Sequence, residues 1–286
     1  MTDSALISVV LPTYDAGKYL RPSVLSILRQ TYQNWEMLII DDCSQDNALD
    51  SIRDISDMRI RIIRNNLNEG VTVRLNQGIA LARGQFLARM DQDDVSHPMR
   101  LELQLAFLMR NPDVDLLATK CLAINHENTI VGLISPKLMH EAICSRVWSS
   151  INMPHPSWMG KTIWFKRFMY AVPGPFFCDD QELLLRAHKE SRYACLDSAL
   201  LAYRIRNQVN LKKNLITRLA ILKIQLKAFH KSRHWFFFCM AIINFFVKSG
   251  YDLCRVIFKK SPVSTSNYFP DKLHVDWEDV FREIKS

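Results

Sequence analysis

The segment Gly84-Gln85-Phe86-Leu87-Ala88-Arg89-Met90-Asp91-Gln92-Asp93-Asp94 decides the fold. Its apolar part, residues 86–90, follows a glycine and predicts a short buried strand. The strand runs into three carboxylates, and alternation along an extended backbone would place Asp91 and Asp93 on the same face. Two such carboxylates suit a hard divalent cation, Mn²⁺ or Mg²⁺, which prefers oxygen ligands. The alternative for so short a motif is an acidic turn that caps the next helix.

Three strand–helix units precede this segment. Strands are predicted at residues 6–11, 35–40 and 59–63, and helices at 19–30, 44–55 and 71–82. This alternation, with nearly continuous apolar strands, is typical of a parallel sheet covered by helices on both faces. Ligands of such sheets bind beyond the carboxyl ends of the strands. The loops at Thr13, Asp42 and Asp91 all follow those ends, so we expect them to converge on one site.

The second half of this compact region mixes helices, strands and loops. We expect a helix at 97–110, a strand at 114–118, a hairpin at 122–134, an amphipathic helix at 137–149, a helix at 178–188 and a strand at 196–203. His155 lies in a loop punctuated by prolines. The sequence therefore predicts one α/β domain over residues 1–205.

Residues 206–286 are expected to form a separate basic, helical region. The protein has 286 residues and a net charge of +8, and residues 205–260 contain Asp252 as their sole acidic residue beside many Lys and Arg. Leucines and Phe229 recur at helical spacing over 211–231 opposite a set of lysines, and an apolar, aromatic stretch follows at 235–247. We expect residues 211–260 to bind a membrane surface. The alternative is that these helices pack on the catalytic domain and expose a solvated charged face.

Cysteine content and hydropathy argue against several other classes of protein: disulfide-rich, zinc-binding, secreted and membrane-spanning. The seven cysteines are odd in number and scattered without a C-x-x-C pair, which argues against a disulfide framework or a zinc site and for a reducing compartment. The N-terminus lacks the pattern of a signal peptide. The apolar stretch at 235–247 is shorter than the roughly 20 residues that a spanning helix needs, so no membrane span is expected. A nucleic-acid-recognition module is also not apparent.

Several motifs, in order, resemble those of family-2 glycosyltransferases with the Rossmann-like GT-A fold. The matching pieces are Val9 to Tyr14, Ser26 to Tyr32, Glu36 to Asp42 with Ser44 and Asp46, Asn68 to Val71, Leu75 to Gly84, Ala88 to Asp94, and more weakly His155-Pro156-Ser157 and Asp179 to Leu183. The resemblance covers residues 5–205. It implies a mostly parallel sheet flanked by helices, with the C-terminal helical region as an extension, and transfer of a sugar from a nucleotide-sugar to an acceptor hydroxyl with inversion.

The resemblance also implies a donor site. Asp42 would accept a hydrogen bond from the nucleobase imide, as suits uracil, and Thr13 would lie beside the base. Asp91 would reach the ribose or donor sugar, and Asp93, with Asp91, would hold the cation that bridges the two phosphates. The remaining donor-site residues that the resemblance implies are Tyr14, Asn76 and Arg206.

On the acceptor side, the resemblance implies a base in the acidic pair that begins the helix at 178–188. Asp180 is the expected base and Asp179 the fallback, because this chain has Asp where Glu is usual. His155 would shape the acceptor pocket. Two positions depart from the family's pattern: Cys43 stands where glycine is common, and Arg206 stands where a histidine often helps to hold the metal. An arginine can neutralise diphosphate but cannot bind a cation, which leaves the third protein ligand open.

Two functions other than glycosyl transfer are also compatible with parts of the sequence. Asp91-Gln92-Asp93-Asp94-Val95 also fits the nucleophile motif of haloacid-dehalogenase-like phosphatases, although that motif normally follows the first strand. A non-catalytic protein that binds sugar nucleotides is another class. The setting implied by the resemblance is bacterial surface polysaccharide synthesis (O-antigen or capsule). The donor would be a UDP-sugar, the acceptor a lipid-linked saccharide, and the location the cytoplasmic face of the cell membrane.

Overall fold

A mixed α/β sheet forms the centre of the molecule. The computed structural model describes residues 4–175, 177–205, 211–257 (backbone alone for 255–257) and 276–284. Its strands are β1 (Ile7–Thr13), β2 (Trp35–Asp41), β3 (Ile60–Arg64), β4 (Phe86–Arg89), β5 (Val95–Ser96), β6 (Leu116–Ile124), β7 (Ile130–Ile134), β8 (Met159–Lys161) and β9 (Tyr193–Arg204). They are ordered β3-β2-β1-β4-β8-β6-β9-β5, with β7 paired to β6. This is the predicted fold class.

The first half of the sheet is parallel and the second half is mixed. Strands β3, β2, β1 and β4 run parallel, as does the long pair β6 and β9, whereas β8 lies antiparallel between β4 and β6. The expected hairpin at 122–134 is confirmed as β6 and β7. Because β1, β2 and β4 end at the same edge of the sheet, the loops after them lie next to one another.

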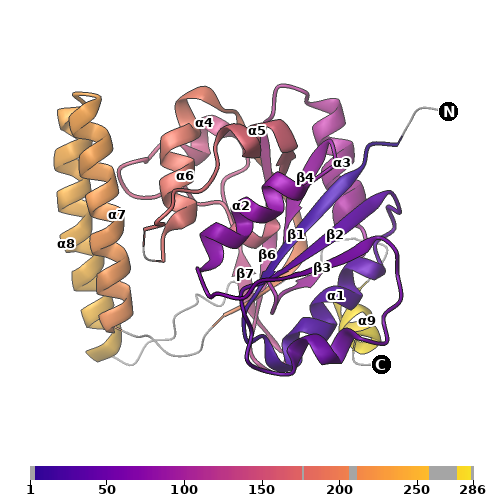
Figure 1. The fold of residues 1–286 in the computed structure, drawn as a ribbon. Helices are drawn as coiled ribbons and strands as arrows, with labels where there is room; N and C mark the ends of the chain where they lie inside the picture. The colour runs from indigo at the N-terminus through magenta and orange to yellow at the C-terminus, as the bar shows by residue number, and fades with distance from the viewer. Residues whose placement is uncertain (1–3, 176, 206–210, 258–275, 285–286) are drawn as a thin grey trace.

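Alternate residues of β1 face two different cores. Val9 and Leu11 pack with α1 (Leu20–Leu28), whereas Val10 packs with α2 (Val71–Leu81) on the opposite face. Side chains alternate along a strand, so an unbroken apolar run is required where helices cover both faces. Figure 1 shows α2 in front of these strands and α1 behind them.

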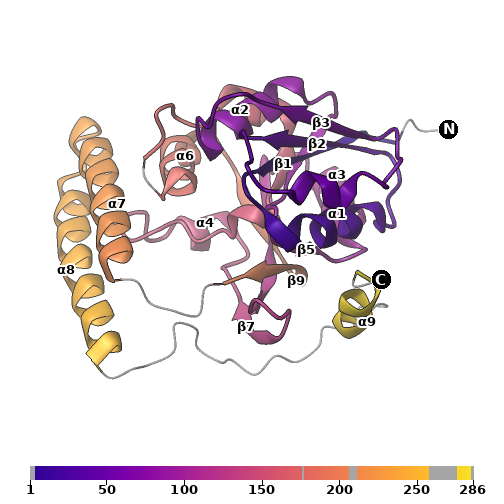
Figure 2. The same cartoon turned by 60° about the horizontal axis from the view of Figure 1, so that its bottom comes forward.

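The remaining helices complete both layers and the C-terminal part. They are η1 (Gly17–Tyr19), η2 (Ala48–Ile52), α3 (Arg100–Arg110), α4 (His140–Ile143), η3 (His155–Ser157), α5 (Thr162–Arg167), α6 (Asp179–Ala187), η4 (His188–Glu190), α7 (Leu211–Lys231), α8 (Trp235–Ile257) and α9 (Trp277–Glu283). Figures 1 and 2 both show α7 and α8 as a hairpin that stands beside α6 at one end of the molecule. Helix α9 returns to the sheet, where Nε1 of Trp277 donates a 3.1 Å hydrogen bond to the carbonyl of Ala199.

Two helix predictions are wrong. The amphipathic helix expected at 137–149 is limited to the four residues of α4, and the helix expected at 44–55 is limited to the five residues of η2. Serine side chains offer the backbone other partners: Oγ of Ser145 donates to the carbonyl of Ala142, and Oγ of Ser149 donates to Asn244. The first is a local bond, of the kind that competes with helical hydrogen bonding, and the second joins residues that are far apart in the chain.

The expected absence of a membrane span rested on the apolar stretch at residues 235–247, and the helix that contains this stretch is longer. Within α8, Trp235–Cys254 has 20 residues and a mean hydropathy of 1.3, so it is long and apolar enough by length and composition. The apolar run of residues 235–247, which is broken by Asn244, ends before Lys248, and the helix continues through polar residues that lower the average without bringing it below this level. In the described part of the chain, α8 is the helix that meets this criterion.

Candidate active site

Gln92 joins the loop after β1 to the acidic loop after β4. Its side-chain oxygen accepts a 2.9 Å hydrogen bond from Oγ1 of Thr13 and a 2.7 Å bond from the backbone N–H of Tyr14, and its amide nitrogen donates to the carbonyl of Tyr14 at 3.0 Å. The backbone N–H of Asp42 donates to the carbonyl of Thr13 at 2.8 Å. The three loops that were expected to converge are therefore joined to one another. No sequence pattern indicated that the middle residue of the D-x-D motif makes this connection.

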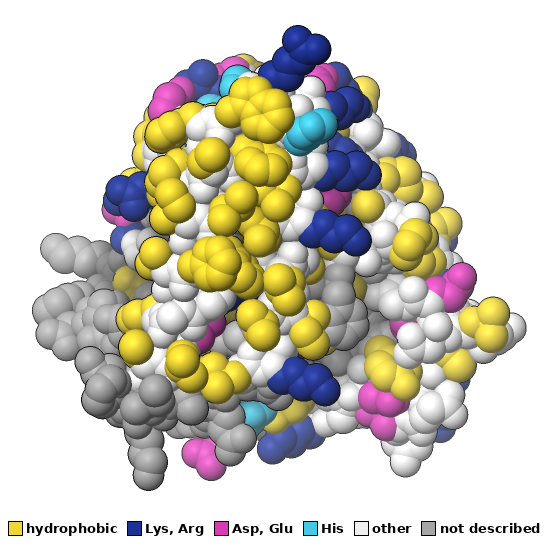
Figure 3. All heavy atoms as spheres, turned by 90° about the vertical axis from the view of Figure 1, so that its left-hand side faces the viewer, with side chains coloured by type: hydrophobic (Ala, Val, Ile, Leu, Met, Phe, Trp, Pro, Cys, Tyr) yellow, Lys and Arg dark blue, Asp and Glu magenta, His cyan; other side chains and the backbone are white. Residues whose placement is uncertain are grey.

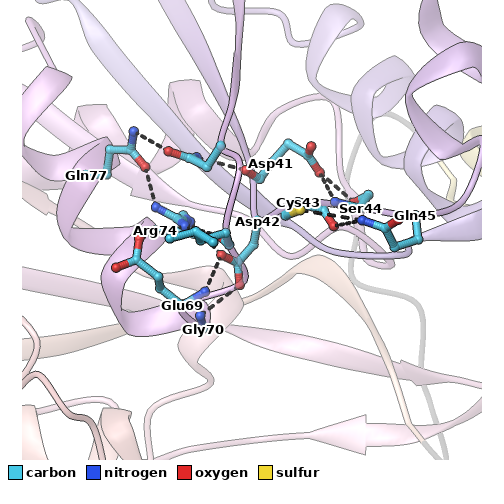
Figure 4. A network of polar contacts seen from close by, with 11 residues as sticks. Asp41, Asp42, Cys43, Ser44, Gln45, Glu69, Gly70, Arg74 and Gln77 are labelled. Atoms are coloured by element: carbon cyan, nitrogen blue, oxygen red, sulfur yellow. Dashed lines mark hydrogen bonds and ion pairs between the residues drawn. The ribbon is translucent and has the colours of Figure 1, made fainter.

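Asp42 lies buried under a network of donors (Figure 4). One carboxylate oxygen accepts from the backbone N–H of Glu69 at 2.9 Å and from Nε of Arg74 at 2.6 Å, and the other accepts from the backbone N–H of Gly70 at 2.8 Å. A carboxylate offers about four acceptor positions, so one remains on the second oxygen. The predicted bond to a nucleobase imide would need that position, and the nucleotide-binding role of Asp42 stays a prediction.

Cys43 has an unusual backbone conformation, one that would suit the glycine expected at this position. Its φ of 67° lies in the left-handed region that glycine adopts without cost. The turn is held by Asp41, whose carboxylate accepts bonds from the backbone N–H and the hydroxyl of Ser44 at 3.2 and 2.5 Å (Figure 4). A cysteine here is accommodated at the expense of backbone strain.

The acidic residues form a compact cluster, but not in the way that strand alternation predicted. Strand β4 ends at Arg89, and the backbone then turns, with the N–H of Asp94 3.5 Å from the carbonyl of Asp91. The expectation of an extended backbone through Asp93 is therefore wrong. The turn still brings one carboxylate oxygen from each of Asp91, Asp93 and Asp94 within 4.8 Å of the others.

Electrostatics favour a cation at this cluster. Burial, and then the charge of Asp91, raise the pKa of the Asp93 carboxyl, and the same causes raise that of Asp94 far above its usual range. One carboxylate oxygen of Asp94 is buried without a hydrogen-bond partner among the described residues. Crowded carboxylates with an oxygen that lacks a donor suit Mn²⁺ or Mg²⁺ in chemistry and in arrangement. The cluster fits the implied metal.

Arg204, at the end of β9, holds the acidic loop from the other side. Its backbone N–H donates to Asp94 at 2.8 Å, and its guanidinium donates to the carbonyl of Asp93 at 2.9 Å and lies 4.5 Å from the ring centre of Tyr19. Arg204 was not among the residues that the sequence indicated for the site. Arg206, predicted to contact the donor, lies outside the described residues, so its role stays a prediction.

Arg89 connects the acidic cluster to the acidic pair on α6. It is 5% exposed and its Nη2 lies 2.5 Å from a carboxylate oxygen of Asp91. Burial would lower the pKa of the guanidinium, but Asp91, Tyr170 and Asp179 outweigh burial and raise it. Its Nε and Nη1 have no hydrogen-bond partner within the described ranges. Arg89 is thus a buried cation placed between two groups of carboxylates.

Asp179 and Asp180 begin α6, where the helix dipole favours negative charge. Burial, and then the neighbouring Asp180, raise the pKa of Asp179 to about 6, with a smaller contribution from Asp91. Burial also raises the pKa of Asp180. The pair lies close to the end of β4, because the backbone N–H of Arg89 donates to the carbonyl of Trp158 at 2.8 Å and the Trp158 ring packs on His155, which is 3.9 Å from Asp179. A carboxylate of raised pKa is suited to act as a base near neutral pH.

His155 lies beside this pair as a neutral side chain. Its Nδ1 is 3.9 Å from a carboxylate oxygen of Asp179, and its Nε2 is 2.5 Å from the hydroxyl of Tyr170. Burial, followed by the charge of Arg89, lowers the pKa of His155 far below its usual range. The predicted acceptor-side position of His155 is thus next to the predicted base, while contact with an acceptor stays a prediction.

Asn76 supports Tyr170 through two bonds. Its amide nitrogen donates to the carbonyl of Tyr170 and its oxygen accepts from the N–H of the same residue, both at 2.9 Å. Both polar groups of the side chain are used in this way, and the predicted nucleotide contact of Asn76 stays a prediction. Tyr170 itself was missed, because it lies in no recognisable motif.

Comparison with known families and relatives agrees with this geometry. Residues 8–160 match the profile described as Glycosyl transferase family 2. The UDP-Glc:alpha-D-GlcNAc-diphosphoundecaprenol beta-1,3-glucosyltransferase WfgD of Escherichia coli is 31% identical over 135 residues, which are 47% of this chain and 53% of that protein. The chain therefore spans about half the length of that relative. An uncharacterized glycosyltransferase of Methanocaldococcus jannaschii is 27% identical over 289 residues, which cover 93% of this chain and 98% of that protein.

Two solved structures share the fold. S. aureus TarS in complex with UDP superposes with a TM-score of 0.58 and 21% identity, over 77% of this chain and 65% of that one. The mannosyltransferase PcManGT from Pyrobaculum calidifontis, in complex with GDP-Man and Mn²⁺, superposes with a TM-score of 0.62 and 13% identity, over 90% of this chain and 80% of that one. At these identities the likeness concerns the fold, which is GT-A.

Proposed function

The chain belongs to Glycosyl transferase family 2, and from that membership we propose that it transfers a sugar from a UDP-sugar to a hydroxyl of a lipid-linked saccharide, with inversion. One observation carries the proposal: two groups of carboxylates, on the loop after β4 and at the start of α6, interact across the buried guanidinium of Arg89. An inverting transferase needs a cation site for the leaving group and a base on the opposite side of the anomeric carbon.

The haloacid-dehalogenase-like alternative is wrong. The family profile includes the acidic motif within residues 8–160 and identifies the chain as a glycosyltransferase. In addition, β4 is the fourth strand along the chain, preceded by three strand–helix units. The same membership favours catalysis over a purely non-catalytic role, and the Asp180→Asn variant described below separates the two.

On the donor side, Asp91 and Asp93 would hold Mn²⁺ or Mg²⁺. The cation, when bound, neutralises the charge that develops on the diphosphate as the glycosidic bond breaks. The chain's own contribution is to fix these ligands: Gln92 and Arg204 hold the acidic loop from two sides, and Arg89 fixes the carboxylate of Asp91. Thr13, Tyr14 and Asp42 lie at the adjoining strand ends, where a nucleobase would bind.

On the acceptor side, Asp180 would take the proton from the attacking hydroxyl. The hydroxyl oxygen forms the new bond to the anomeric carbon, the bond from that carbon to the diphosphate breaks, and the nucleoside diphosphate leaves with the electron pair. The raised pKa values of Asp179 and Asp180 support this assignment, since a stronger base accepts the proton more readily. Neutral His155 and Tyr170 would orient Asp179 beside the base.

The proposed donor and acceptor are chosen from what similar proteins are named for or contain. The E. coli relative is named for a UDP-glucose donor and a diphosphoundecaprenol-linked acceptor, and the TarS structure contains UDP. PcManGT contains GDP-Man, so the fold itself accepts more than one nucleotide. We propose a role in bacterial surface polysaccharide synthesis, O-antigen or capsule, since one relative in B. subtilis is named for teichuronic acid biosynthesis and one in E. coli for colanic acid biosynthesis.

A donor screen with matched variants tests the proposal. Hydrolysis and transfer would be measured with UDP-, dTDP- and GDP-sugars, with Mn²⁺ or Mg²⁺, using the wild type, Asp180→Asn and Glu182→Gln. Asp180→Asn should lower kcat by about 10²–10⁴-fold and leave UDP affinity unchanged, because it removes proton transfer alone. Glu182→Gln changes a carboxylate on the same helix that pairs with Arg186 and should have little effect on kcat. Turnover of no UDP-sugar, or full activity of Asp180→Asn, would contradict it.

A further inference from the structure

Helix α8 has its polar residues turned toward the protein. Asn244, Lys248 and Asp252 are spaced by four residues and lie on one helix face. Asp252 is 6% exposed and accepts a 2.6 Å bond from Nε of Arg218 on α7. Nζ of Lys248 donates to the carbonyl of Ser149 at 3.3 Å, and Asn244 accepts from the hydroxyl of Ser149 at 3.2 Å. The hairpin is thus fastened to the catalytic domain through polar contacts.

The apolar residues of α8 face outward. Figure 3 shows hydrophobic side chains gathered in one broad surface over the end of the molecule where the hairpin lies. We call the outward side chains of α8 the outer face; its large members, each more than half exposed, are Trp235, Phe236, Ile243, Phe246, Val247, Tyr251 and Leu253. A water-facing helix has the opposite polarity, with apolar residues inside. Contiguous apolar surfaces of this kind mark a site where something else binds.

The charges beside the outer face are positive. Lys223, Lys227 and Lys231 are exposed and spaced by four residues on α7, and Figure 3 shows Lys and Arg side chains along one edge of the apolar surface. The acidic residue within residues 211–254, Asp252, is buried in its ion pair with Arg218. A partner that covers the outer face would therefore meet apolar side chains bordered by cations. Anionic lipid at a bilayer surface has the complementary chemistry.

The packing of α8 favours a position in the plane of the membrane over one across it. Phe237 and Ala241 pack with Phe229 of α7 in the same core that reaches the catalytic sheet. A spanning orientation would carry Lys248 and Asp252 into hydrocarbon, away from Ser149 and Arg218. Ionisable groups in that environment are costly. An in-plane helix keeps these polar contacts and buries only its outer face in lipid.

We propose that the outer face of α8 inserts into the surface of a bilayer that contains anionic lipid, with the lysine row of α7 at the headgroups. This surface would hold the enzyme as a peripheral protein at the cytoplasmic side of the cell membrane. The inference concerns where the protein binds and does not depend on the identity of the sugar or of the catalytic base.

Vesicle flotation with the full-length protein tests the proposal. The protein would be mixed with phosphatidylcholine vesicles that contain either none or a third of phosphatidylglycerol. The double substitution Ile243→Asp/Phe246→Asp should abolish flotation, because it places two charges in the outer face. The triple substitution Lys223→Gln/Lys227→Gln/Lys231→Gln should weaken binding to the anionic vesicles by about a hundredfold, at about fivefold per lysine. The matched control, Ile163→Asp, changes an apolar residue on α5 that is 76% exposed and should float like the wild type.

Separate measurements distinguish loss of the surface from loss of the fold and from other occupants. Each variant should keep the wild-type melting temperature and UDP affinity, so that a failure of the surface is separable from a failure of the site. In-plane binding is reversible, so wild-type protein should move to a second vesicle population within minutes, whereas a spanning helix inserts irreversibly. Wild-type protein that ignores anionic vesicles, that cannot be transferred, or that forms a dimer broken by Ile243→Asp/Phe246→Asp would overturn the proposal.

Discussion

Oγ1 of Thr13 donates a 2.9 Å hydrogen bond to the side-chain oxygen of Gln92, so the predicted nucleobase loop and the predicted metal loop are fixed to each other by two side chains. The residue between the two aspartates of a D-x-D motif usually attracts no attention, because it carries no charge. Here it makes three hydrogen bonds to the loop after β1. The relative position of base and diphosphate therefore depends on Gln92.

Replacing Gln92 should weaken donor binding more than it changes the chemical step. Gln92→Ala removes all three bonds, and we expect a rise of about tenfold in the Kd for UDP, as for the loss of one or two net hydrogen bonds. Isothermal titration with UDP and Mn²⁺ would measure it. The control is Gln33→Ala, just before β2 and therefore at the amino ends of the strands, away from the site. An unchanged Kd for UDP in Gln92→Ala would show that the loops keep their positions without the Gln92 side chain.

The buried pair of Arg74 and Asp42 should be essential for stability. Both residues are less than 5% exposed, and Arg74→Met leaves the Asp42 carboxylate buried without its cation. We expect the free energy of unfolding to fall by about 3 kcal/mol or more, since removal of one partner of a buried pair typically costs that much. Urea denaturation would measure it.

Two further variants isolate the charge of Asp42 as the cause. Arg74→Met/Asp42→Asn should recover part of the loss, because the uncompensated charge is gone. Arg53→Met, which breaks an exposed pair with Asp50, should change the free energy of unfolding by less than about 1 kcal/mol. Equal losses in Arg74→Met and Arg53→Met would contradict this account.

Asp93→Asn should separate metal binding from folding stability. Burial and Asp91 raise the pKa of Asp93, which means that folding disfavours its charged form relative to the unfolded chain. The neutral amide should therefore raise the melting temperature in EDTA, while it removes the increase that Mn²⁺ gives the wild type. Thermal melts with and without Mn²⁺ would test both parts. Asp197→Asn, at an exposed carboxylate that pairs with Lys120, should leave the Mn²⁺ effect intact.

Turnover should fall in acid as the pair on α6 takes up a proton. The pKa of Asp179 is raised to about 6, so the pair is fully ionised only above that pH. A base works in its ionised form, and kcat should decrease about tenfold per pH unit below about 6. Asp179→Asn removes the neighbouring negative charge from Asp180 and should move this acid limb to lower pH. An acid limb that does not move would exclude coupling between the two carboxylates.

The same pair has a consequence for stability. Because the folded-state pKa of Asp179 lies above the usual value, its protonation favours the folded protein. The contribution is complete below pH 4 and is lost as the pH rises to about 6. Asp179→Asn should remove this part of the pH dependence of the melting temperature.

Cys43→Gly should stabilise the protein. The φ of 67° at Cys43 costs a non-glycine residue roughly 1 kcal/mol, which glycine does not incur. Part of this gain is offset by the greater freedom of glycine in the unfolded chain. Chemical denaturation of Cys43→Gly beside Cys43→Ala would test it. Cys43→Ala keeps the strained conformation, so a gain in that variant as well would point to the thiol rather than to the backbone.

Regular strands and helices of the first half were predictable, whereas irregular connections were not. Strands β1 to β4 and helices α1 and α2 show hydrophobic periodicity, because helices cover both faces of the sheet. The order of apolar residues in the sequence therefore reveals these elements. The helix expected at 137–149 is not formed over its full length, and the hydroxyl of Ser149 at its end binds Asn244, a partner that lies close only after folding. Helix α9 was missed because its apolar face packs against strands that lie far away in the sequence.

By itself, the sequence determined the fold class, the family and the loops that form the site, since these depend on local periodicity and on motifs at strand ends. Only the tertiary structure decided which side chains hold those loops: Gln92 reaches Thr13, Arg204 holds Asp93 and Asp94, and Arg89 lies between Asp91 and Asp179. It also decided which face of α8 is turned outward. The physical reason is the same in each case: hydrogen bonds, charge interactions and burial depend on distance in space, and these partners are brought together by the sheet rather than by neighbouring positions in the chain.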